Sequence, residues 1–253
     1  MQENKRIWIV GGSTGIGLEL VQLCLESNYY VIASSRNATK NDSLLMLKDE
    51  YQEKIKLIDI DVSSKEKIHN CVNEAWNTYE GLDIWFYNAG AYEVMSINEW
   101  NIEKFEEMNE VNYLGVIRLM SELLPYFKKQ KRGHWVWNSS LSSSFGLPQG
   151  GGYSAPKAAL VNLAQSIQPE LDLLKIDLQI INHGFVKTRL TDKNKFEMPQ
   201  LMQPKFTAEK IFEGIQNPKS FEIRFPFLLA SFLSMLKIMP YKMSLYLTKR
   251  MIP

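Results

Sequence analysis

The sequence predicts an α/β fold, a doubly wound parallel sheet of about seven strands with helices on both faces. Short apolar runs such as Ile7–Val10 and Trp135–Trp137 are typical of strands that are buried on both faces of a parallel sheet. Longer segments with apolar residues at helical intervals alternate with these runs, and this alternation is typical of βαβ units. A length of 253 residues suits one such unit, so we expect a single domain covering the whole chain.

The expected elements follow one another along the whole chain. The expected strands are Ile7–Val10, Tyr30–Ser34, Lys56–Ile60, Asp83–Tyr87, Trp135–Trp137, Asp177–Asn182 and Ser220–Ile223. The expected helices are Leu18–Glu26, Leu44–Tyr51, Ile68–Tyr79 and Thr207–Ile215, and a further helix presents Tyr153 and continues through Leu160–Leu174. The segment Glu99–Gln130 has apolar residues at helical intervals and is long enough for two consecutive helices.

Composition narrows the classes of function. Hydrophobic residues make up 45% of the chain and charged residues 23%, which are ordinary values for a globular protein. The net charge of +1 creates no general attraction to nucleic acid, and we expect no nucleic-acid partner. Cys24 and Cys71 lack metal-ligand spacing and are expected to be free thiols in a reducing cytoplasm, so no metal site is predicted. The apolar run Ile7–Val10 is too short for the core of a signal peptide.

The glycine-rich segment after the first strand predicts a diphosphate site. It has the spacing Gly-x-x-x-Gly-x-Gly and leads from a strand into a helix. Glycines let the backbone approach a ligand closely, and the helix N-terminus offers free N–H groups to an anion. The residues of this candidate site are Gly11, Ser13, Thr14, Gly15, Ile16 and Gly17. The alternative is a plain glycine-rich turn.

The residues at the end of the second strand indicate whether NAD or NADP is preferred. Ser35 and Arg36 stand where an acid would bind the ribose hydroxyls of NAD and repel a 2′-phosphate. A guanidinium instead matches a phosphate bidentately, so NADP(H) is favoured over NAD(H). The alternative is that Arg36 caps the sheet edge and stacks on the adenine.

A candidate catalytic group follows the fifth expected strand. Tyr153 and Lys157 are four residues apart and so share one face of a helix, with Pro156 expected in its first turn. A phenol titrates near ~10 and exchanges protons poorly at neutral pH, whereas a neighbouring ammonium lowers its pKa. Ser140 stands thirteen residues before Tyr153, at the end of the strand.

With Ser140, Tyr153 and Lys157 at this spacing, and with the glycine pattern near the N-terminus, the sequence resembles the short-chain dehydrogenase/reductase family. The resemblance extends from Ile7 to about Thr188. It implies a Rossmann-like fold with strand order 3-2-1-4-5-6-7, and reversible NADP(H)-dependent interconversion of a carbonyl and a secondary alcohol. It also implies a small-molecule substrate and a homodimer or homotetramer.

The resemblance adds cofactor-binding residues at the ends of three further strands. Asp61 and Val62 match a pair that meets the adenine, although Asp61 could instead cap the helix that starts near Ser64. Asn88, Ala89 and Gly90 match the small residues beside the cofactor, while Tyr87 replaces an asparagine that makes a hydrogen bond in the sheet. Three more residues, Gly184, Val186 and Thr188, match the segment that meets the nicotinamide. His183 replaces a proline there and is interpreted as a tolerated structural change rather than a new catalyst.

The same resemblance implies roles in the reaction. Ser140 would polarise the substrate carbonyl and Tyr153 would donate the proton to the developing alkoxide. Lys157 would lower the tyrosine pKa and hold the nicotinamide ribose. Asn112, which is a poor helix former, matches the asparagine that orders a water relay, with an exposed helix face or a local kink as alternatives.

Two segments have no counterpart in these motifs. The stretch 188–206 mixes apolar residues with charges, including the cations Arg189, Lys193 and Lys195, and is expected to be a substrate lid. The alternative is that its apolar residues are packing contacts. The tail 225–253 carries the apolar run Phe227–Leu236, followed by basic residues. Ten such residues are about half of a membrane span. A packing role as a pocket wall or dimer contact is favoured over an interfacial membrane helix. The alternative functions are a catalytically weak NADP-binding regulator and a membrane-peripheral reductase of lipid metabolism.

Overall fold

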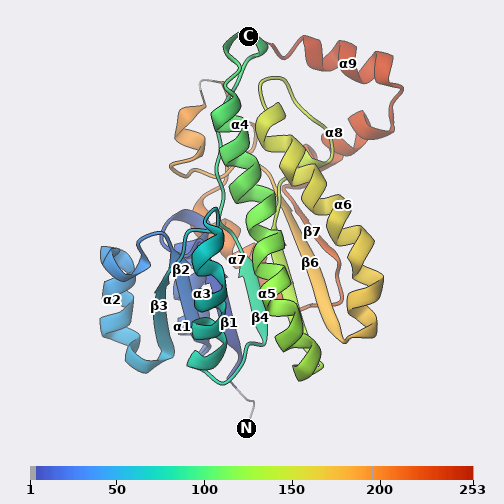
Figure 1. Ribbon diagram of the computed structural model, residues 1–253. Coiled ribbons are helices and arrows are strands. Elements are labelled where there is room, and N and C mark those ends of the chain that lie inside the picture. The colour runs from blue at the N-terminus through green and yellow to red at the C-terminus, as the bar shows by residue number, and fades with distance from the viewer. Residues whose placement is uncertain (1–3, 195, 253) are drawn as a thin grey trace.

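The computed structural model describes residues 4–194 and 196–252, and Figure 1 shows how its helices and strands are arranged. Lys195 of the expected lid and Pro253 of the expected tail lie outside the described residues. In the described part of the chain one parallel sheet has seven strands in the order β3-β2-β1-β4-β5-β6-β7, which confirms the doubly wound fold and its strand order. The strands are β1 Arg6–Val10, β2 Tyr30–Ser35, β3 Ile55–Asp59, β4 Ile84–Tyr87, β5 Gly133–Asn138, β6 Ile176–His183 and β7 Glu222–Phe225.

Helices cover both faces of this sheet (Figure 1). They are α1 Gly15–Glu26, α2 Asp42–Tyr51, α3 Lys65–Thr78, α4 Ile102–Asn109, α5 Gly115–Gln130, α6 Gly151–Leu173, α7 Pro204–Ile215, α8 Phe227–Ile238 and α9 Tyr241–Lys249. Apolar residues of α3, α5 and α6 share one buried cluster with the sheet, and those of α1 and α7 share another. The two clusters pack on opposite faces of the sheet. Because the strands are parallel, their carboxyl ends all lie on the same side of the sheet.

Tryptophans form a row across one face of the sheet. Trp8, Trp85 and Trp135 are paired in register on three neighbouring strands, and all three are fully buried. The rings of Trp85 and Trp135 meet edge to face at 5.5 Å. Each such side chain removes a large apolar area from water, so this row is a large part of the core on that face.

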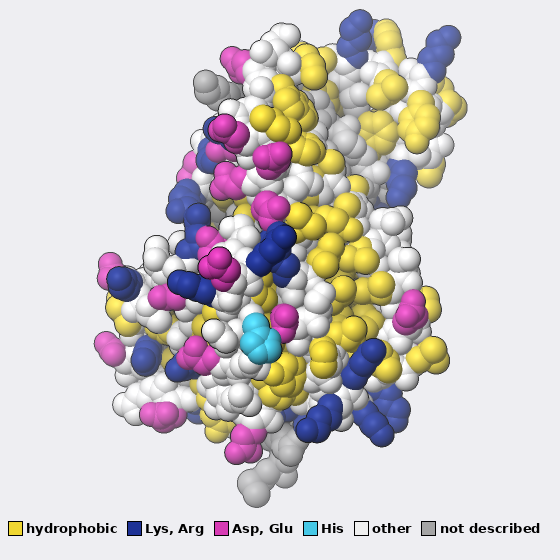
Figure 2. Space-filling view, in the orientation of Figure 1, with side chains coloured by type: hydrophobic (Ala, Val, Ile, Leu, Met, Phe, Trp, Pro, Cys, Tyr) yellow, Lys and Arg dark blue, Asp and Glu magenta, His cyan; other side chains and the backbone are white. Residues whose placement is uncertain are grey.

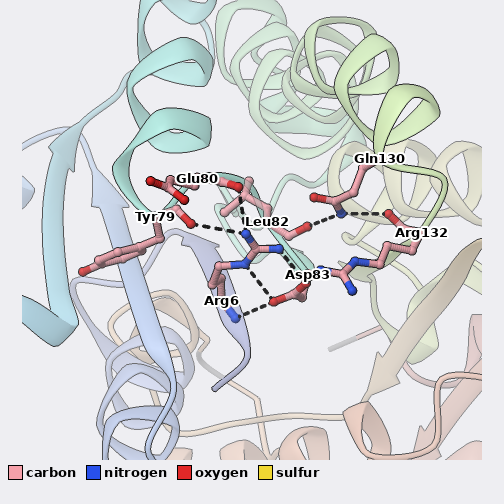
Figure 3. A network of polar contacts seen from close by, with 7 residues as sticks. All are labelled: Arg6, Tyr79, Glu80, Leu82, Asp83, Gln130 and Arg132. Atoms are coloured by element: carbon pink, nitrogen blue, oxygen red, sulfur yellow. Dashed lines mark hydrogen bonds and ion pairs between the residues drawn. The ribbon is translucent and has the colours of Figure 1, made fainter. Parts of the chain in front are cut away.

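A polar network lies at the amino ends of the strands, opposite to their carboxyl ends (Figure 3). The Arg6 guanidinium pairs with the Asp83 carboxylate at 2.8 Å and also donates to the carbonyls of Tyr79 and Glu80. Gln130 donates to the carbonyl of Leu82 at 2.7 Å. These contacts tie β1 to the turn before β4 and to the end of α5, far from the edge where ligands bind in such folds.

The helices that the sequence predicts individually all begin earlier than expected, and the starts of α1 and α6 bear on the site. Helix α1 begins at Gly15 rather than Leu18. The prediction placed the start too late because two glycines, which have a low helix propensity, occupy the first turn. Helix α6 begins at Gly151, so Pro156 lies in its second turn and not in the first. The last strand is also displaced and begins at Glu222 instead of Ser220.

The segment Glu99–Gln130 contains two consecutive helices, as the sequence predicts, and they are joined without a break. Helix α4 runs directly into α5 through the π-helical turn Glu110–Leu114. A π turn inserts one extra residue into the helix and is frequent at functional sites. Asn112 lies in this turn and is fully buried, so the exposed-face alternative for it is wrong.

Candidate active site

A cleft of about 690 Å³ opens along the carboxyl ends of the strands. Its walls come from the loops that follow β1 to β6 and from α8. Of the residues that the sequence predicts for the site, all line this cleft except Gly17 and Asn112. Gly17 packs against Gly11 and Asn112 bonds to Ala91, so both support residues that line the cleft.

The glycine-rich turn is packed so tightly that side chains would not fit. Gly11 has φ +89°, and a Cβ there would come within 2.5 Å of the Ala89 nitrogen. A Cβ on Gly17 would lie 2.0 Å from the Gly11 carbonyl oxygen. Thr14, at the N-cap of α1, makes no side-chain capping bond. The first N–H groups of α1 therefore face the cleft without a capping side chain, which is the arrangement that binds a phosphate.

The loop after β6 meets this turn from the opposite side of the cleft. A Cβ on Gly15 would lie 3.1 Å from Cγ2 of Thr188. The Thr191 hydroxyl donates to the Val186 carbonyl at 2.6 Å and accepts from the Thr188 nitrogen at 3.0 Å. The structure thus brings the two candidate phosphate-contacting segments together, although they are far apart in the sequence.

One end of the cleft has the two candidate adenosine-binding pairs. Arg36 is exposed on the cleft wall, and no hydrogen bond or ion pair to it is found within residues 4–194 and 196–252. Asp61 accepts from the Ser63 nitrogen at 2.9 Å and hydroxyl at 2.6 Å. Partial burial alone would raise the Asp61 pKa, but the Ser63 hydrogen bonds and the Arg36 charge lower it. Ser64 is the N-cap of α3, so the alternative in which Asp61 caps that helix is wrong.

Two asparagines lock the strand ends beneath the middle of the cleft. Asn88 donates from Nδ2 to the Gly11 carbonyl at 2.8 Å, and Oδ1 of Asn88 accepts from Asn138 at 2.8 Å. These bonds join the ends of β1, β4 and β5. Ala89 and Gly90 continue from Asn88 along the cleft wall.

Both polar atoms of the Asn112 amide form hydrogen bonds with the backbone of Ala91. Its Nδ2 donates to the Ala91 carbonyl at 2.8 Å, and its Oδ1 accepts from the Ala91 nitrogen at 3.0 Å. The asparagine thereby holds the segment after Gly90 against the π turn. Tyr87, fully buried below it, donates its phenol to the Val111 carbonyl at 2.5 Å. The phenol thus bonds the end of β4 to the π turn.

The serine and the tyrosine of the candidate catalytic group lie together. Ser140 lies two residues after the end of β5 and caps a short 3₁₀ helix, Leu141–Ser143. Tyr153 lies in the first turn of α6 and is half-buried. Burial raises the Tyr153 pKa to about 12, and the hydrogen bond with Ser140 acts in the opposite direction. Desolvation of the phenol is the largest cause of this shift, and the lowering of the Tyr153 pKa that is expected from Lys157 stays a prediction.

Lys157 lies one turn further along α6 and is only 4% exposed. Its ammonium donates to the Asn138 carbonyl at 2.7 Å and lies 5.7 Å from the centre of the Tyr153 ring. Burial lowers the Lys157 pKa to about 7. The Lys157 amine therefore changes its charge near physiological pH, in contrast to an ordinary lysine.

His183 and Gly184 occupy the end of β6 beside Lys157. Burial lowers the His183 pKa to about 4, so the imidazole is neutral, and its Nδ1 donates to the Gly184 carbonyl at 2.7 Å. A Cβ on Gly184 would lie 2.8 Å from Pro226 and 2.9 Å from Leu229. The glycine thus lets the start of α8 pack directly on this loop.

Sequence reasoning missed three residues of the cleft. Tyr92 meets the Tyr153 ring edge to face at 5.0 Å and donates its phenol to Oδ1 of Asn194 at 2.7 Å. This bond joins the expected lid to the loop after β4. Asn138 holds both Asn88 and Lys157. A polar residue at the carboxyl end of an apolar strand was the available signal for Asn138, whereas none marked Tyr92 or Asn194.

The other end of the cleft is apolar. Its lining includes Leu147, Phe185, Phe196, Leu229 and Leu233, the last two from α8. Residues of α8 also form a buried cluster with Leu141. No helix in the described ranges is long and apolar enough to cross a membrane, and no cluster of metal-ligating side chains was found there.

Comparisons with known proteins agree with this geometry. A family model described as short chain dehydrogenase matches residues 5–198. An uncharacterized oxidoreductase of Myxococcus xanthus (strain DK1622) is 29% identical over 235 residues, which cover 92% of this chain and 91% of that protein.

Solved structures have the same fold. An alcohol dehydrogenase from the archaeon Thermococcus sibiricus, complexed with 5-hydroxy-NADP, has a TM-score of 0.77 and 26% identity, with 88% of this chain and 96% of that chain covered. A short chain dehydrogenase from Burkholderia cenocepacia J2315, in complex with NADP, has a TM-score of 0.83 at 18% identity, with 98% and 99% covered. Since the family model covers most of its length, the chain belongs to the short-chain dehydrogenase/reductase family of oxidoreductases.

Proposed function

We propose that the protein is an NADP(H)-dependent oxidoreductase that interconverts a carbonyl and a secondary alcohol on an apolar substrate. The observation that carries the proposal is the hydrogen-bonded pair Ser140–Tyr153, with Lys157 one helical turn away, in the same cleft as the glycine-rich turn. A phenol, a hydroxyl and an ammonium in this arrangement form a proton donor beside a second hydrogen-bond donor.

The cleft fits a dinucleotide. The close approach of Gly11 and Gly17 leaves room for a diphosphate on the uncapped start of α1, and Thr188 faces the same place. Ser35, Arg36, Asp61 and Val62 would hold the adenosine end, and the residues from Asn88 to Gly90 and from Gly184 to Val186 the nicotinamide end. When bound, the nicotinamide supplies or accepts the hydride.

Arg36 supports NADP(H) over NAD(H). Its guanidinium is exposed on the cleft wall, and no carboxylate is recorded in an ion pair with it among the described residues. A free guanidinium at this position matches a 2′-phosphate. The Burkholderia and Thermococcus relatives are bound to NADP or a derivative of it, which agrees with this preference.

Tyr153 acts as the acid when the carbonyl is reduced. A phenol whose pKa is raised to about 12 carries its proton at neutral pH and can donate it to the developing alkoxide. Ser140 donates a second hydrogen bond to the same oxygen. Lys157 would hold the nicotinamide ribose, and a charged Lys157 would favour the phenolate that remains after proton transfer. Asn112 fixes Ala91 and thereby the wall that faces these groups.

The substrate is proposed to be apolar because the end of the cleft beyond Tyr153 is lined by leucines and phenylalanines. Residues 188–206 would act as the lid, held by the Tyr92–Asn194 bond and by the pair of Lys193 with Glu93 at 2.5 Å. The tail 225–253 would supply the wall through α8.

The proposal also covers compartment and assembly. Cys24 and Cys71 are free and buried, which suits a reducing cytoplasm. Figure 2 shows a strip of hydrophobic side chains along α5 and α6. Partly buried apolar residues of these two helices include Met120, Leu124 and Val161. This strip would be the contact of a homodimer or homotetramer.

The experiment that tests the proposal replaces Tyr153 with Phe. We expect NADPH binding by fluorescence to be nearly unchanged, and NADPH oxidation with a panel of carbonyls of increasing chain length to fall by about 10²–10⁴-fold. Tyr79→Phe is the control, because it removes the 2.9 Å phenol bond to the Glu53 carbonyl outside the cleft. Full turnover in the Tyr153→Phe variant would show that the phenol is not the acid.

A further inference from the structure

The tail helices expose an unusual amount of apolar surface. In α8, Phe227, Met235 and Ile238 follow one another at helical spacing on the outer side and are 78%, 43% and 84% exposed. The opposite side of the same helix is buried, with Leu229 and Leu233 at the cleft. A helix that is apolar all round is normally surrounded by protein or lipid. Only one side of α8 is covered by the described protein.

Helix α9 has its polar and apolar faces reversed. Ser244 and Thr248, one turn apart, are its buried side chains, and both hydroxyls donate to carbonyls of their own helix. Tyr241, Leu245 and Tyr246 instead face outward, with exposed fractions of 77%, 57% and 57%. A surface helix of a globular protein places its apolar stripe on the core. The outward stripe of α9 therefore fits an apolar environment outside the protein.

Positive charge accompanies this surface. Residues 223–253 contain no Asp or Glu, although the net charge of the whole chain is only +1. Lys237, Lys242, Lys249 and Arg250 all lie in or directly after α8 and α9, and no salt bridge involves them within the described residues. Figure 2 shows dark blue and yellow side chains over α9 without magenta ones. We call the exposed side chains of residues 227–252 the tail surface.

We propose that the tail surface docks on a bilayer that contains anionic phospholipid. The apolar side chains enter the boundary between headgroups and acyl chains, tyrosines lie at the headgroup level, and the cations attract the lipid phosphates. The protein lies on the membrane and does not cross it.

Charge argues against a second copy of the chain as the occupant. A two-fold contact through the tail surface would bring eight cations together with no carboxylate from residues 223–253 to compensate them. The strip along α5 and α6 offers a second copy an apolar face without this repulsion. Docking also puts the cleft near lipid, because Leu229 and Leu233 lie on the opposite side of α8, about 10 Å from the outer stripe.

The test is sedimentation of the full-length protein with vesicles, in the absence of any carbonyl substrate. One set of vesicles is phosphatidylcholine, and the other is a roughly 7:3 mixture of phosphatidylcholine and phosphatidylglycerol. We expect binding to the mixed vesicles at low salt, weaker binding at high salt, and much weaker binding to phosphatidylcholine alone. Failure to bind the mixed vesicles overturns docking and leaves the proposed reaction untouched.

Two pairs of variants separate charge from apolar insertion. Lys242→Gln with Lys249→Gln should weaken binding to the mixed vesicles by about fivefold per cation. Lys128→Gln with Lys129→Gln, an equal change of charge in the last turn of α5, should not weaken it. Phe227→Ser with Leu228→Ser should also release the protein, whereas Met46→Ser with Leu173→Ser, at 72% and 85% exposure elsewhere, should not.

The proposal is overturned if both pairs of tail variants bind the mixed vesicles as strongly as the wild type. It is also overturned by a wild-type dimer that Phe227→Ser with Leu228→Ser converts to a monomer in light scattering, since the surface would then belong to a second copy. Circular dichroism and thermal unfolding check that the variants are folded. The lysine pair changes solvent-facing side chains alone, so its result stands if the apolar pair misfolds.

Discussion

The phenol of Tyr87 donates a hydrogen bond of 2.5 Å to the carbonyl of Val111 and joins the end of β4 to the π turn. The contact is close-packed, because a Cβ on Gly115 would lie 2.4 Å from the phenol oxygen. Burial raises the Tyr87 pKa, so the phenol keeps its proton and remains a donor. Asn112 follows Val111 directly, and its position therefore depends on Tyr87.

Tyr87→Phe should lower both stability and turnover. Loss of the phenol leaves the Val111 carbonyl without this donor in a buried place, which costs about 1–3 kcal/mol of the free energy of unfolding. We expect kcat to fall several-fold because Asn112 is held less firmly, while KM and NADPH affinity stay close to wild type. Urea unfolding and steady-state kinetics measure the two effects.

Tyr126→Phe is the matched control, since Tyr126 lies on α5 and its phenol bonds to Asn73 of α3, outside the cleft. It should lower stability without lowering kcat. An unchanged kcat in Tyr87→Phe would mean that the tyrosine supports the fold alone.

Arg36→Asp should reverse the preference between dinucleotides. Loss of the guanidinium removes charge-assisted bonds worth about 1.5–3 kcal/mol, or roughly 10–10²-fold in NADP affinity. The new carboxylate can accept from the ribose hydroxyls of NAD. Titration calorimetry with both dinucleotides gives the ratio, and Lys48→Asp on α2 controls for the change of charge. A ratio equal to that of the wild type would remove Arg36 from the phosphate site.

Lys157→Met should stabilise the protein at neutral pH although it abolishes activity. The folded-state pKa of Lys157 is about 7, below the value near ~10.4 of an unfolded lysine. Between these two values the unfolded chain binds more protons, so the free energy of unfolding of the wild type rises with pH. The advantage of the variant should be about 1–2 kcal/mol at pH 7 and shrink towards pH 10. Urea unfolding at both pH values tests this, and a pH-independent difference would contradict it.

Asp83→Asn should destabilise the protein without affecting the cleft. Partial burial alone would raise the Asp83 pKa, but the hydrogen bonds and charge of Arg6 lower it. The stabilisation is therefore present above the unfolded pKa near ~3.9 and is lost as pH falls through the folded-state pKa. We expect a loss of about 2–3 kcal/mol at pH 7 that disappears in acid.

Asp177→Asn is the comparison for this change, because Asp177 pairs with Lys219, which is 76% exposed. Its loss should be at most about 1 kcal/mol. Equal losses in the two variants, measured by urea unfolding, would show that the partly buried pair has no special weight.

Most of the sheet could be predicted from the sequence because strands such as β1 and β4 are apolar runs with a turn signal at their end, whereas β7 alternates charged and apolar residues and its start was misplaced. The helix starts could not be placed as well. Gly15 and Gly151 begin α1 and α6, yet glycine propensity argues against helix at both positions. The π turn could not be predicted, because the apolar pattern of Glu99–Gln130 indicates two consecutive helices and does not report the kind of turn that joins them.

The candidate site could be predicted where its chemistry depends on residue type and spacing, as at Tyr153 and Lys157. It could not be predicted where the contact is between distant loops. Tyr92 reaches the Tyr153 ring only because the loop after β4 folds over α6, and Leu229 reaches the cleft only because Gly184 lets α8 approach. The lowered pKa of Lys157 follows from burial, which no local pattern reports.

The π turn Glu110–Leu114 also sets the rotational phase of the long helical run. Each residue of an α-helix advances the side chain by about 100°, so one extra residue turns α4 relative to α5 by roughly that angle. Met108 of α4 is buried and lines the cleft, while α5 presents Val116 and Leu119 to the sheet. Deleting one residue from the turn would restore uninterrupted α-helical phase and could satisfy only one of these two faces.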